Sequence, residues 1–207
     1  MPSNPSRLAD ALTIKYKSLE HTRSKTEYLY SHGVIALRDK RQFYEGLFLN
    51  THVIFESFIE DLFFGLLVNG SKTLTPSKII PRIEIGSHII ARELVNGPQK
   101  NYISWLPYEN TIKLAKIFFR SGSPFTDLGS AEKDDLRKCH IIRNAIAHNS
   151  GYSRKKFESN VIGTAPVSRA ERNPTSYLMG VYRISPEQTR YQLYAAKLRQ
   201  IAVKLTR

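Results

Sequence analysis

The sequence predicts a mainly α-helical fold in one domain spanning residues 1–207, and three stretches carry this prediction. Between residues 37 and 69, large apolar residues recur at spacings of seven, four, three and four, which is typical of a buried helix face: Phe48, Phe55, Ile59, Leu62 and Leu66. Residues 7–31 place apolar positions among charges without a proline, which indicates an amphipathic helix with Ser6 as its N-cap. Residues 132–148 begin with acidic side chains, which suit the positive end of a helix dipole.

The rest of the chain predicts shorter elements. Prolines interrupt residues 71–129, so short helices joined by loops are expected there. Residues 152–184 lose helical periodicity, and their apolar runs at 161–163 and 177–182 fit the strands of a small β-hairpin. Ser185-Pro186-Glu187-Gln188 has the pattern of a capping box with proline at the first helical position, and it predicts the start of the last helix.

Composition excludes several classes of protein. A chain of 207 residues with 41% hydrophobic residues can bury roughly 70% of its unfolded surface, so it is not disordered. The single cysteine, Cys139, excludes a disulfide framework and multi-cysteine metal sites, and is expected in the core. The most apolar stretch, 53–68, contains three acidic residues and is too short to span a bilayer. Residues 1–10 carry no secretory signal pattern, so we expect a cytoplasmic protein with no membrane partner.

The net charge of +13 is concentrated in the last third of the chain. Residues 137–207 contain 14 Lys or Arg and three Glu, a net charge of +11, against +2 for residues 1–136. This asymmetry favours a polyanionic partner, because cationic side chains that neutralise phosphates release condensed counterions. Six aromatic residues among these charges are available to stack on unpaired bases: Tyr152, Phe157, Tyr177, Tyr182, Tyr191 and Tyr194. The alternative is a solvated basic face with these aromatic residues in the core.

Most familiar catalytic signatures are absent from the sequence. There is no phosphate-binding loop, no glycine-rich dinucleotide motif, no His-Glu-x-x-His and no Gly-x-Ser-x-Gly. His140 and His148 are eight positions apart, which matches no common metal pair on a helix, so no metal or cofactor is expected. What remains is the segment 143–148, Arg-Asn-Ala-Ile-Ala-His, which gathers a cation, an amide and an imidazole in the last two turns of a predicted helix.

This segment resembles the Arg-x4-6-His motif of the HEPN superfamily of helical nucleotide-binding and ribonuclease domains, including the polar residue directly after the Arg. Residues 51–62 resemble the aromatic-Glu-x-Phe helix of several prokaryotic HEPN families, and residues 105–108 with the short helix after them fit the same order of elements. The resemblance covers roughly residues 40–151, whereas the hairpin departs from a minimal four-helix HEPN bundle. It implies a HEPN-like helical bundle that dimerises, so that the motifs of two chains face each other across one cleft. The apolar stripe from Phe48 to Leu66 is a candidate for that interface.

Where the Arg and His are kept, the resemblance implies a metal-independent endoribonuclease, and the chemistry of RNA agrees. RNA supplies its own nucleophile, the 2′-hydroxyl, so a protein need only move protons and stabilise a pentacoordinate phosphate. His148 is the candidate proton-transfer group, because a free imidazole titrates near ~6.5. Arg143 is the candidate for binding non-bridging phosphate oxygens, and Asn144 for orienting the phosphate or the imidazole. Flanking phosphates have candidate ligands just beyond the motif: Arg154, Lys155 and Lys156.

Two questions about this motif stay open in the sequence. Positions five apart lie about 140° apart around a regular helix, so Arg143 and His148 do not share one face. Either the helix loosens before His148, or each phosphate is bound partly by the opposite subunit. In a purely structural reading, Arg143 pairs with a core carboxylate such as Glu56, and His148 hydrogen-bonds the end of its own helix. Glu56 is also a candidate to support the site by orienting Arg143.

The leading hypothesis is a homodimeric HEPN endoribonuclease that cleaves RNA to leave a 2′,3′-cyclic phosphate and a 5′-hydroxyl. By family resemblance it acts as a toxin or phage-defence effector, for which a cognate antitoxin protein is a further expected partner. The alternative is a non-catalytic HEPN module that binds nucleic acid or a partner protein and regulates it. A third reading is a helical scaffold whose basic face keeps it soluble.

Overall fold

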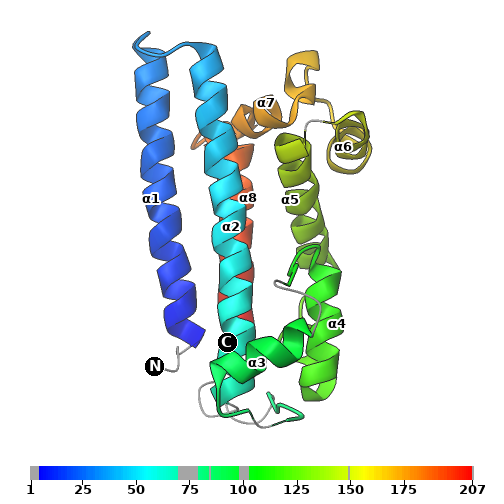
Figure 1. Ribbon diagram of the computed structural model, residues 1–207. Helices are drawn as coiled ribbons and strands as arrows, with labels where there is room; N and C mark the ends of the chain where they lie inside the picture. Colours follow the sequence, from blue (N-terminus) through cyan, green and yellow to red (C-terminus); the bar gives the residue numbers. More distant parts are fainter. Residues whose placement is uncertain (1–4, 70–78, 84, 98–102, 149, 207) are drawn as a thin grey trace. The chain divides into compact units, whose positions relative to one another are not determined.

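The computed structural model of the chain describes residues 5–69, 79–83, 85–97, 103–148 and 150–206, and these are mainly α-helical (Figure 1). The helices are α1 (Pro5–Ser31), α2 (Leu37–Asn69), α3 (His88–Asn96), α4 (Tyr108–Phe118), α5 (Ser130–His148), α6 (Gly151–Phe157), α7 (Pro174–Met179) and α8 (Arg190–Leu205). Shorter helical turns are η2 (Arg120–Gly122), the π-helical η3 (Glu158–Ile162) and η4 (Arg169–Arg172). The strands β1 (Val181–Arg183) and β2 (Gln188–Thr189) form an antiparallel hairpin.

The contacts within the chain divide it into two compact units. Unit 1 comprises Met1–Thr13, Phe55–Asp134 and Arg199–Arg207, and unit 2 comprises Ile14–Ile54 and Asp135–Leu198. The boundaries fall inside α1, α2, α5 and α8, so each unit contains a part of each of these four helices.

Unit 1 has an aromatic core centred on Phe63 of α2. The ring centroid of Phe63 lies 4.9 Å from that of Trp105, 5.1 Å from that of Phe119 and 5.4 Å from that of Phe125. The Trp105 indole N–H donates to a carboxylate oxygen of Glu60 at 3.2 Å, so its one polar side-chain atom is satisfied. These contacts pack the residues just before and after α4 against the C-terminal part of α2.

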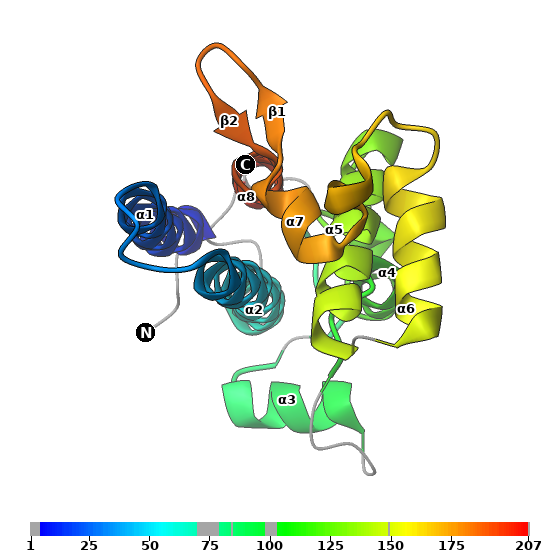
Figure 2. The ribbon, with the colours of Figure 1, turned by 90° about the horizontal axis from the view of Figure 1, so that it is seen from above.

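Unit 2 has a core of tyrosines between α2 and α8; α8 lies behind α2 in Figure 1, and the view from above in Figure 2 shows the two helices next to each other. Tyr44 meets Tyr191 edge to face at 5.8 Å, and Phe48 meets Tyr194 in the same way at 6.5 Å. The hydroxyls of Tyr191 and Thr51 lie 3.2 Å apart. Buried aromatic area and a hydroxyl that finds a partner both stabilise this packing.

The long helices confirm the predictions from periodicity. Helix α2 has the predicted bounds, and its apolar stripe is buried: Phe48, Phe55, Ile59, Leu62 and Leu66. Because this stripe is core, it does not offer the dimer interface expected of it. Helix α1 begins at Pro5, so the prediction of Ser6 as its cap is wrong; proline is well tolerated in a first turn. No helix in the described part of the chain is both long and apolar enough to cross a membrane.

The prediction of strands at 161–163 and 177–182 is wrong for most of these residues. Val161 and Ile162 are buried in the π-helical turn η3. Helix α7 contains residues 177–179, because the Asn173 side chain accepts hydrogen bonds from the backbone N–H groups of two residues in the first turn, and Pro174 follows at the first helical position.

A hairpin does precede the C-terminal helix, as the fold class predicts, but it uses β1 and β2. The Ser185-Pro186 pair lies between these strands, so the predicted helix start there is wrong. Helix α8 begins at Arg190 instead, because Thr189 and Gln192 form their own capping pair. The Gln192 side-chain oxygen accepts from the Thr189 N–H at 3.0 Å, and the Thr189 hydroxyl oxygen accepts from the Gln192 N–H at 3.4 Å.

Candidate functional site

The Arg-x4-6-His segment lies at the C-terminal end of α5, within unit 2. Helix α5 stays α-helical through His148, so the alternative in which the helix loosens before this residue is not observed. Residues four positions apart are separated by about 40° on such a helix, so His140, Asn144 and His148 form one column along α5. Arg143 flanks this column.

Three polar side chains of α5 form a continuous chain of contacts. The Arg143 guanidinium donates through Nη1 to the Asn144 Oδ1 at 3.0 Å. The Asn144 Nδ2 lies 2.9 Å from His140 Nε2. All three side chains are half-buried. The structure therefore brings together the predicted Arg143 and Asn144, and it adds His140, which the sequence analysis did not assign to the site. The i, i+4 spacing of His140 and Asn144 was the feature that could have indicated this contact.

A second histidine lies on the core side of these three hydrogen-bonded side chains. His52 of α2 is 3% exposed, and its ring centroid is 5.8 Å from that of His140. Within the described part of the chain, neither ring nitrogen of His52 has a hydrogen-bond partner. Burial is the largest cause that lowers the pKa of His52, and the positive charges of His140, when protonated, and of Arg143 act in the same direction; together they bring it to about 3. At neutral pH, His52 is therefore a neutral imidazole on the core side of the cluster. The sequence analysis did not identify this residue.

Among the described residues, neither end of the motif has the partner that the structural reading assigns to it. His148 is exposed at the end of α5, and none of the described residues forms a hydrogen bond or ion pair with it. Asn149, the residue that follows His148, lies outside the described residues. Within the described ranges, no carboxylate forms an ion pair with Arg143. Glu56 belongs to unit 1 and the motif to unit 2, so its supporting role stays a prediction.

The predicted phosphate ligands Arg154, Lys155 and Lys156 are exposed, and they belong to helix α6 rather than to a turn. This helix lies beside the C-terminal end of α5 in both ribbon views (Figures 1 and 2). The Ser150 hydroxyl caps it by accepting from the Ser153 N–H at 3.1 Å. The Lys156 ammonium is 6.0 Å from the centre of the Tyr152 ring, which is 77% exposed. Basic and aromatic groups thus share one exposed element.

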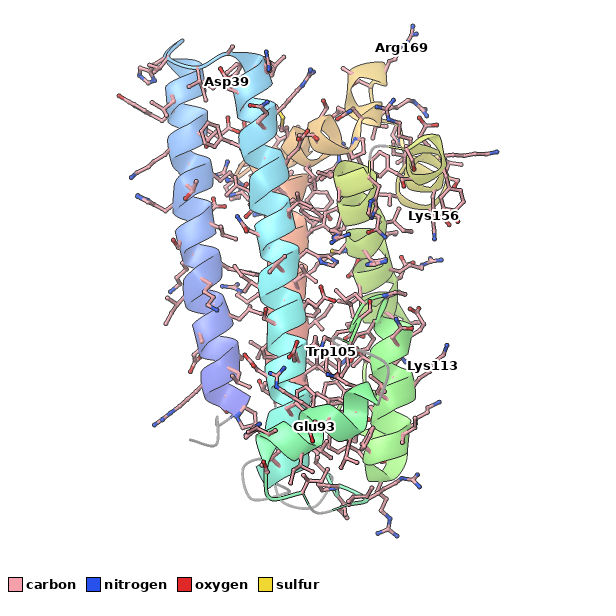
Figure 3. The ribbon with its side chains drawn as sticks, in the orientation of Figure 1. Asp39, Glu93, Trp105, Lys113, Lys156 and Arg169 are labelled. Carbon is pink, nitrogen blue, oxygen red and sulfur yellow. The ribbon has the colours of Figure 1, made fainter. Side chains whose placement is uncertain are left out.

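A second exposed basic element is η4, which sequence reasoning counted in the net charge without singling it out. Arg169 and Arg172 are exposed, and Figure 3 shows Arg169 projecting from the turn. Glu171 is the acidic residue of η4. Its carboxylate accepts a hydrogen bond from Arg190 Nη1 at 2.7 Å, and this bond lowers the pKa of the Glu171 carboxyl. Because Arg190 neutralises Glu171, the outward charge of η4 is positive.

Both basic elements are anchored on Tyr177 of α7. Arg190 lies over the Tyr177 ring, with its guanidinium carbon 4.7 Å from the ring centre, and also donates to the Tyr177 carbonyl at 3.2 Å. The opposite anchor is Phe157, the last residue of α6, whose ring centroid lies 5.5 Å from that of Tyr177. These contacts, which run from Glu171 through Arg190 and Tyr177 to Phe157, therefore connect η4 to α6 inside unit 2.

The expectation that six aromatic residues stack on bases is wrong for four of them. Phe157, Tyr177, Tyr191 and Tyr194 are buried, whereas Tyr152 and Tyr182 are exposed. Cys139 is buried as predicted, and burial raises the pKa of its thiol. In the part of the chain that the structure describes, no three His, Cys, Asp or Glu side chains are grouped so that they could hold a metal ion.

No protein-family model matches this chain, and no curated protein or solved structure is significantly similar to it. Interpretation of the α5 cluster therefore depends on its own geometry.

Proposed function

We propose that the protein is a metal-independent endoribonuclease of HEPN type that acts as a toxin or phage-defence effector. The observation that carries this proposal is the state of the motif: Asn144 holds Arg143, and His148 is exposed at the same helix end. Structural duty in the core would give these groups carboxylate or carbonyl partners. A half-buried cation and an exposed imidazole at the same helix end instead suit a ligand that carries negative charge and a proton to be moved.

The proposed reaction is transfer of a phosphodiester to its own ribose. The 2′-oxygen attacks the adjacent phosphorus while an imidazole, His148, takes its proton. The bond from phosphorus to the 5′-oxygen breaks, and solvent water gives that oxygen a proton. The products are a 2′,3′-cyclic phosphate and a 5′-hydroxyl. Arg143 stabilises the charge that develops on the non-bridging oxygens, and Asn144 supports it by fixing the guanidinium.

We further propose that two chains build one site. The regular helix up to His148 separates Arg143 and His148 by about 140°, so one chain does not present both to the same phosphate. A second copy supplies the missing group, so that Arg143 of one chain and His148 of the other act on the same phosphate.

The direct test is cleavage of total RNA and of a short oligoribonucleotide in the presence of EDTA. We expect wild type to give fragments ending in a cyclic phosphate, and His148→Ala and Arg143→Ala to be at least about 100-fold slower. His21→Ala, which removes an exposed histidine of α1, is the matched control and should cleave like wild type. Equal rates for wild type and His148→Ala would refute the proposed site.

The second candidate function is a non-catalytic HEPN module that binds RNA or a partner protein. The exposed basic residues of α6 and η4, held on one anchor, favour it. It predicts salt-dependent RNA binding without cleavage, and a larger loss of affinity from substitution of residues 154–156 than from His148→Ala.

A further inference from the structure

The chemistry of donors and acceptors fixes how the Arg143–Asn144–His140 chain is oriented. A guanidinium can only donate hydrogen bonds, so the Asn144 carbonyl oxygen must face Arg143. The Asn144 amide nitrogen, which only donates, must then face His140. This order does not depend on how the amide oxygen and nitrogen are told apart, because Arg143 admits one orientation only.

The same logic fixes the state of the His140 ring. Because Asn144 donates to Nε2, this nitrogen must carry a lone pair and no proton. A neutral imidazole has one protonated and one unprotonated nitrogen, so the proton of His140 is on Nδ1. An imidazolium, which donates from both nitrogens, would leave two donors facing each other.

His52 borders the His140 ring from the core side. It packs against His140 from α2 and is buried, and neither of its ring nitrogens has a hydrogen-bond partner among the described residues. An unpaired buried polar atom destabilises a fold, which an apolar residue would avoid, so fold stability alone does not account for an imidazole at this position.

We propose that His140 is a positioning residue: as the neutral Nδ1–H tautomer it accepts from Asn144, and through Asn144 it fixes the guanidinium of Arg143. The part of this inference that concerns RNA cleavage rests on the proposed function. The tautomer and the order of the guanidinium do not depend on it. Loss of the acceptor at position 140 lets the Asn144 amide rotate, and Arg143 then loses the orientation in which it stabilises the transition state.

The test compares His140→Leu, which has no acceptor, with His140→Gln, whose side-chain oxygen can accept from Asn144 at the same i, i+4 spacing. We expect His140→Leu to lower the single-turnover cleavage rate about tenfold, the effect of one lost positioning bond, with the half-saturating RNA concentration unchanged. His140→Gln should stay within about threefold of wild type. His21→Gln is the control for replacing a histidine elsewhere on unit 2.

Asn144→Ala keeps the inference testable if His140→Leu does not fold. It breaks the same chain, so it should cause a similar loss of rate, and adding His140→Gln to it should cause no further loss. Equal slowing by His140→Leu and His140→Gln, or fully additive losses in the double variant, would contradict a positioning role.

Nitrogen NMR separates this inference from the proposed function. In wild type near neutral pH we expect the His140 resonances of an unprotonated Nε2 and a protonated Nδ1. We also expect an ordered Arg143 guanidinium that becomes mobile in Asn144→Ala. These signals decide the inference even if wild type does not cleave RNA. A protonated Nε2, or an Arg143 guanidinium equally mobile in wild type and Asn144→Ala, would overturn it.

Discussion

Burial of the His52 imidazole couples folding stability to pH. Its pKa is about 3 in the folded chain and 6.5 in the unfolded chain, so between these values only the unfolded chain binds the proton. Above the higher pKa, His52 is neutral in both the folded and the unfolded chain, so it contributes no pH dependence to the free energy of unfolding. Below it, the free energy of unfolding falls by up to about 1.4 kcal/mol per pH unit as pH drops toward the lower value.

His52→Phe should remove this dependence while keeping a flat ring of similar size in the core. At about pH 5 the proton taken up on unfolding costs wild type about 2 kcal/mol of stability relative to neutral pH, and the variant should not lose this amount. Urea unfolding at several pH values measures the slope. His21→Phe, at an exposed position, should keep the wild-type slope. A slope unchanged in His52→Phe would show that another group takes up the proton.

At the scale of elements, the anchoring of η4 depends on the close approach of Gly180. A Cβ atom at position 180 would lie 2.0 Å from Glu171 Oε1 and 2.1 Å from Arg190 Nη1. The backbone of Gly180 has a φ of −64°, which alanine adopts without strain, so the effect of a substitution is confined to this clash.

Gly180→Ala should therefore displace the Glu171–Arg190 ion pair and release η4. We expect the free energy of unfolding to fall by about 1–2 kcal/mol, the value of a partly buried charged hydrogen bond. Thermal unfolding measures this change. Gly151→Ala is the control, because nothing lies within 4 Å of its Cβ position. Equal melting temperatures for the two variants would mean that the ion pair adapts at no cost.

The elements that the sequence predicts well are those with long periodic patterns. Helix α2 repeats its apolar spacing over many turns, so no local alternative competes with it. The start of α8 was not predictable in this way, because Ser185 and Thr189 both open a capping-box pattern with Gln three residues later. Burial of Tyr191 against α2 favours the second start, and such a tertiary contact is not readable from one sequence.

The candidate site likewise has one part that local sequence predicts and another part that depends on tertiary packing. Arg143, Asn144 and His148 are neighbours on one helix, so their grouping followed from the sequence. The contact of His140 with Asn144 is also local to α5. His52 comes from a different helix, and its position beside His140 depends on how α2 and α5 pack. Four aromatic residues were misassigned because the alternation of charge and tyrosine in the sequence does not separate a buried ring from an exposed one.

At the scale of the whole molecule, the uneven charge predicts how RNA binding responds to salt. Each phosphate contact to a single strand contributes about 0.7 to the slope of log affinity against log salt. Lys155→Ala/Lys156→Ala should therefore lower the slope for oligouridine by about 1.4, and Arg169→Ala/Arg172→Ala should do the same if η4 also contacts the strand.

Fluorescence anisotropy over a range of salt concentrations measures these slopes. Lys15→Ala/Lys17→Ala, which removes two exposed cations of α1, should leave the slope unchanged. If the α1 pair lowers the slope as much as the α6 pair, binding depends on the overall charge of the molecule and not on these elements.

Assembly of the site from two chains predicts that activity depends on protein concentration. Since α5 holds Arg143 and His148 on different sides of one helix, the proposed site needs a dimer to present both to one phosphate. Below the dissociation constant of the dimer, the cleavage rate per chain should fall in proportion to concentration, whereas a self-sufficient monomer keeps a constant rate per chain. Sedimentation equilibrium over the same concentrations should show dimers dissociating where the rate falls.

Mixing Arg143→Ala with His148→Ala should restore part of the activity, because a mixed dimer still contains one intact Arg143 and one intact His148. A monomer at every concentration with a constant rate per chain would contradict the two-chain site and require Arg143 and His148 to act on different phosphates.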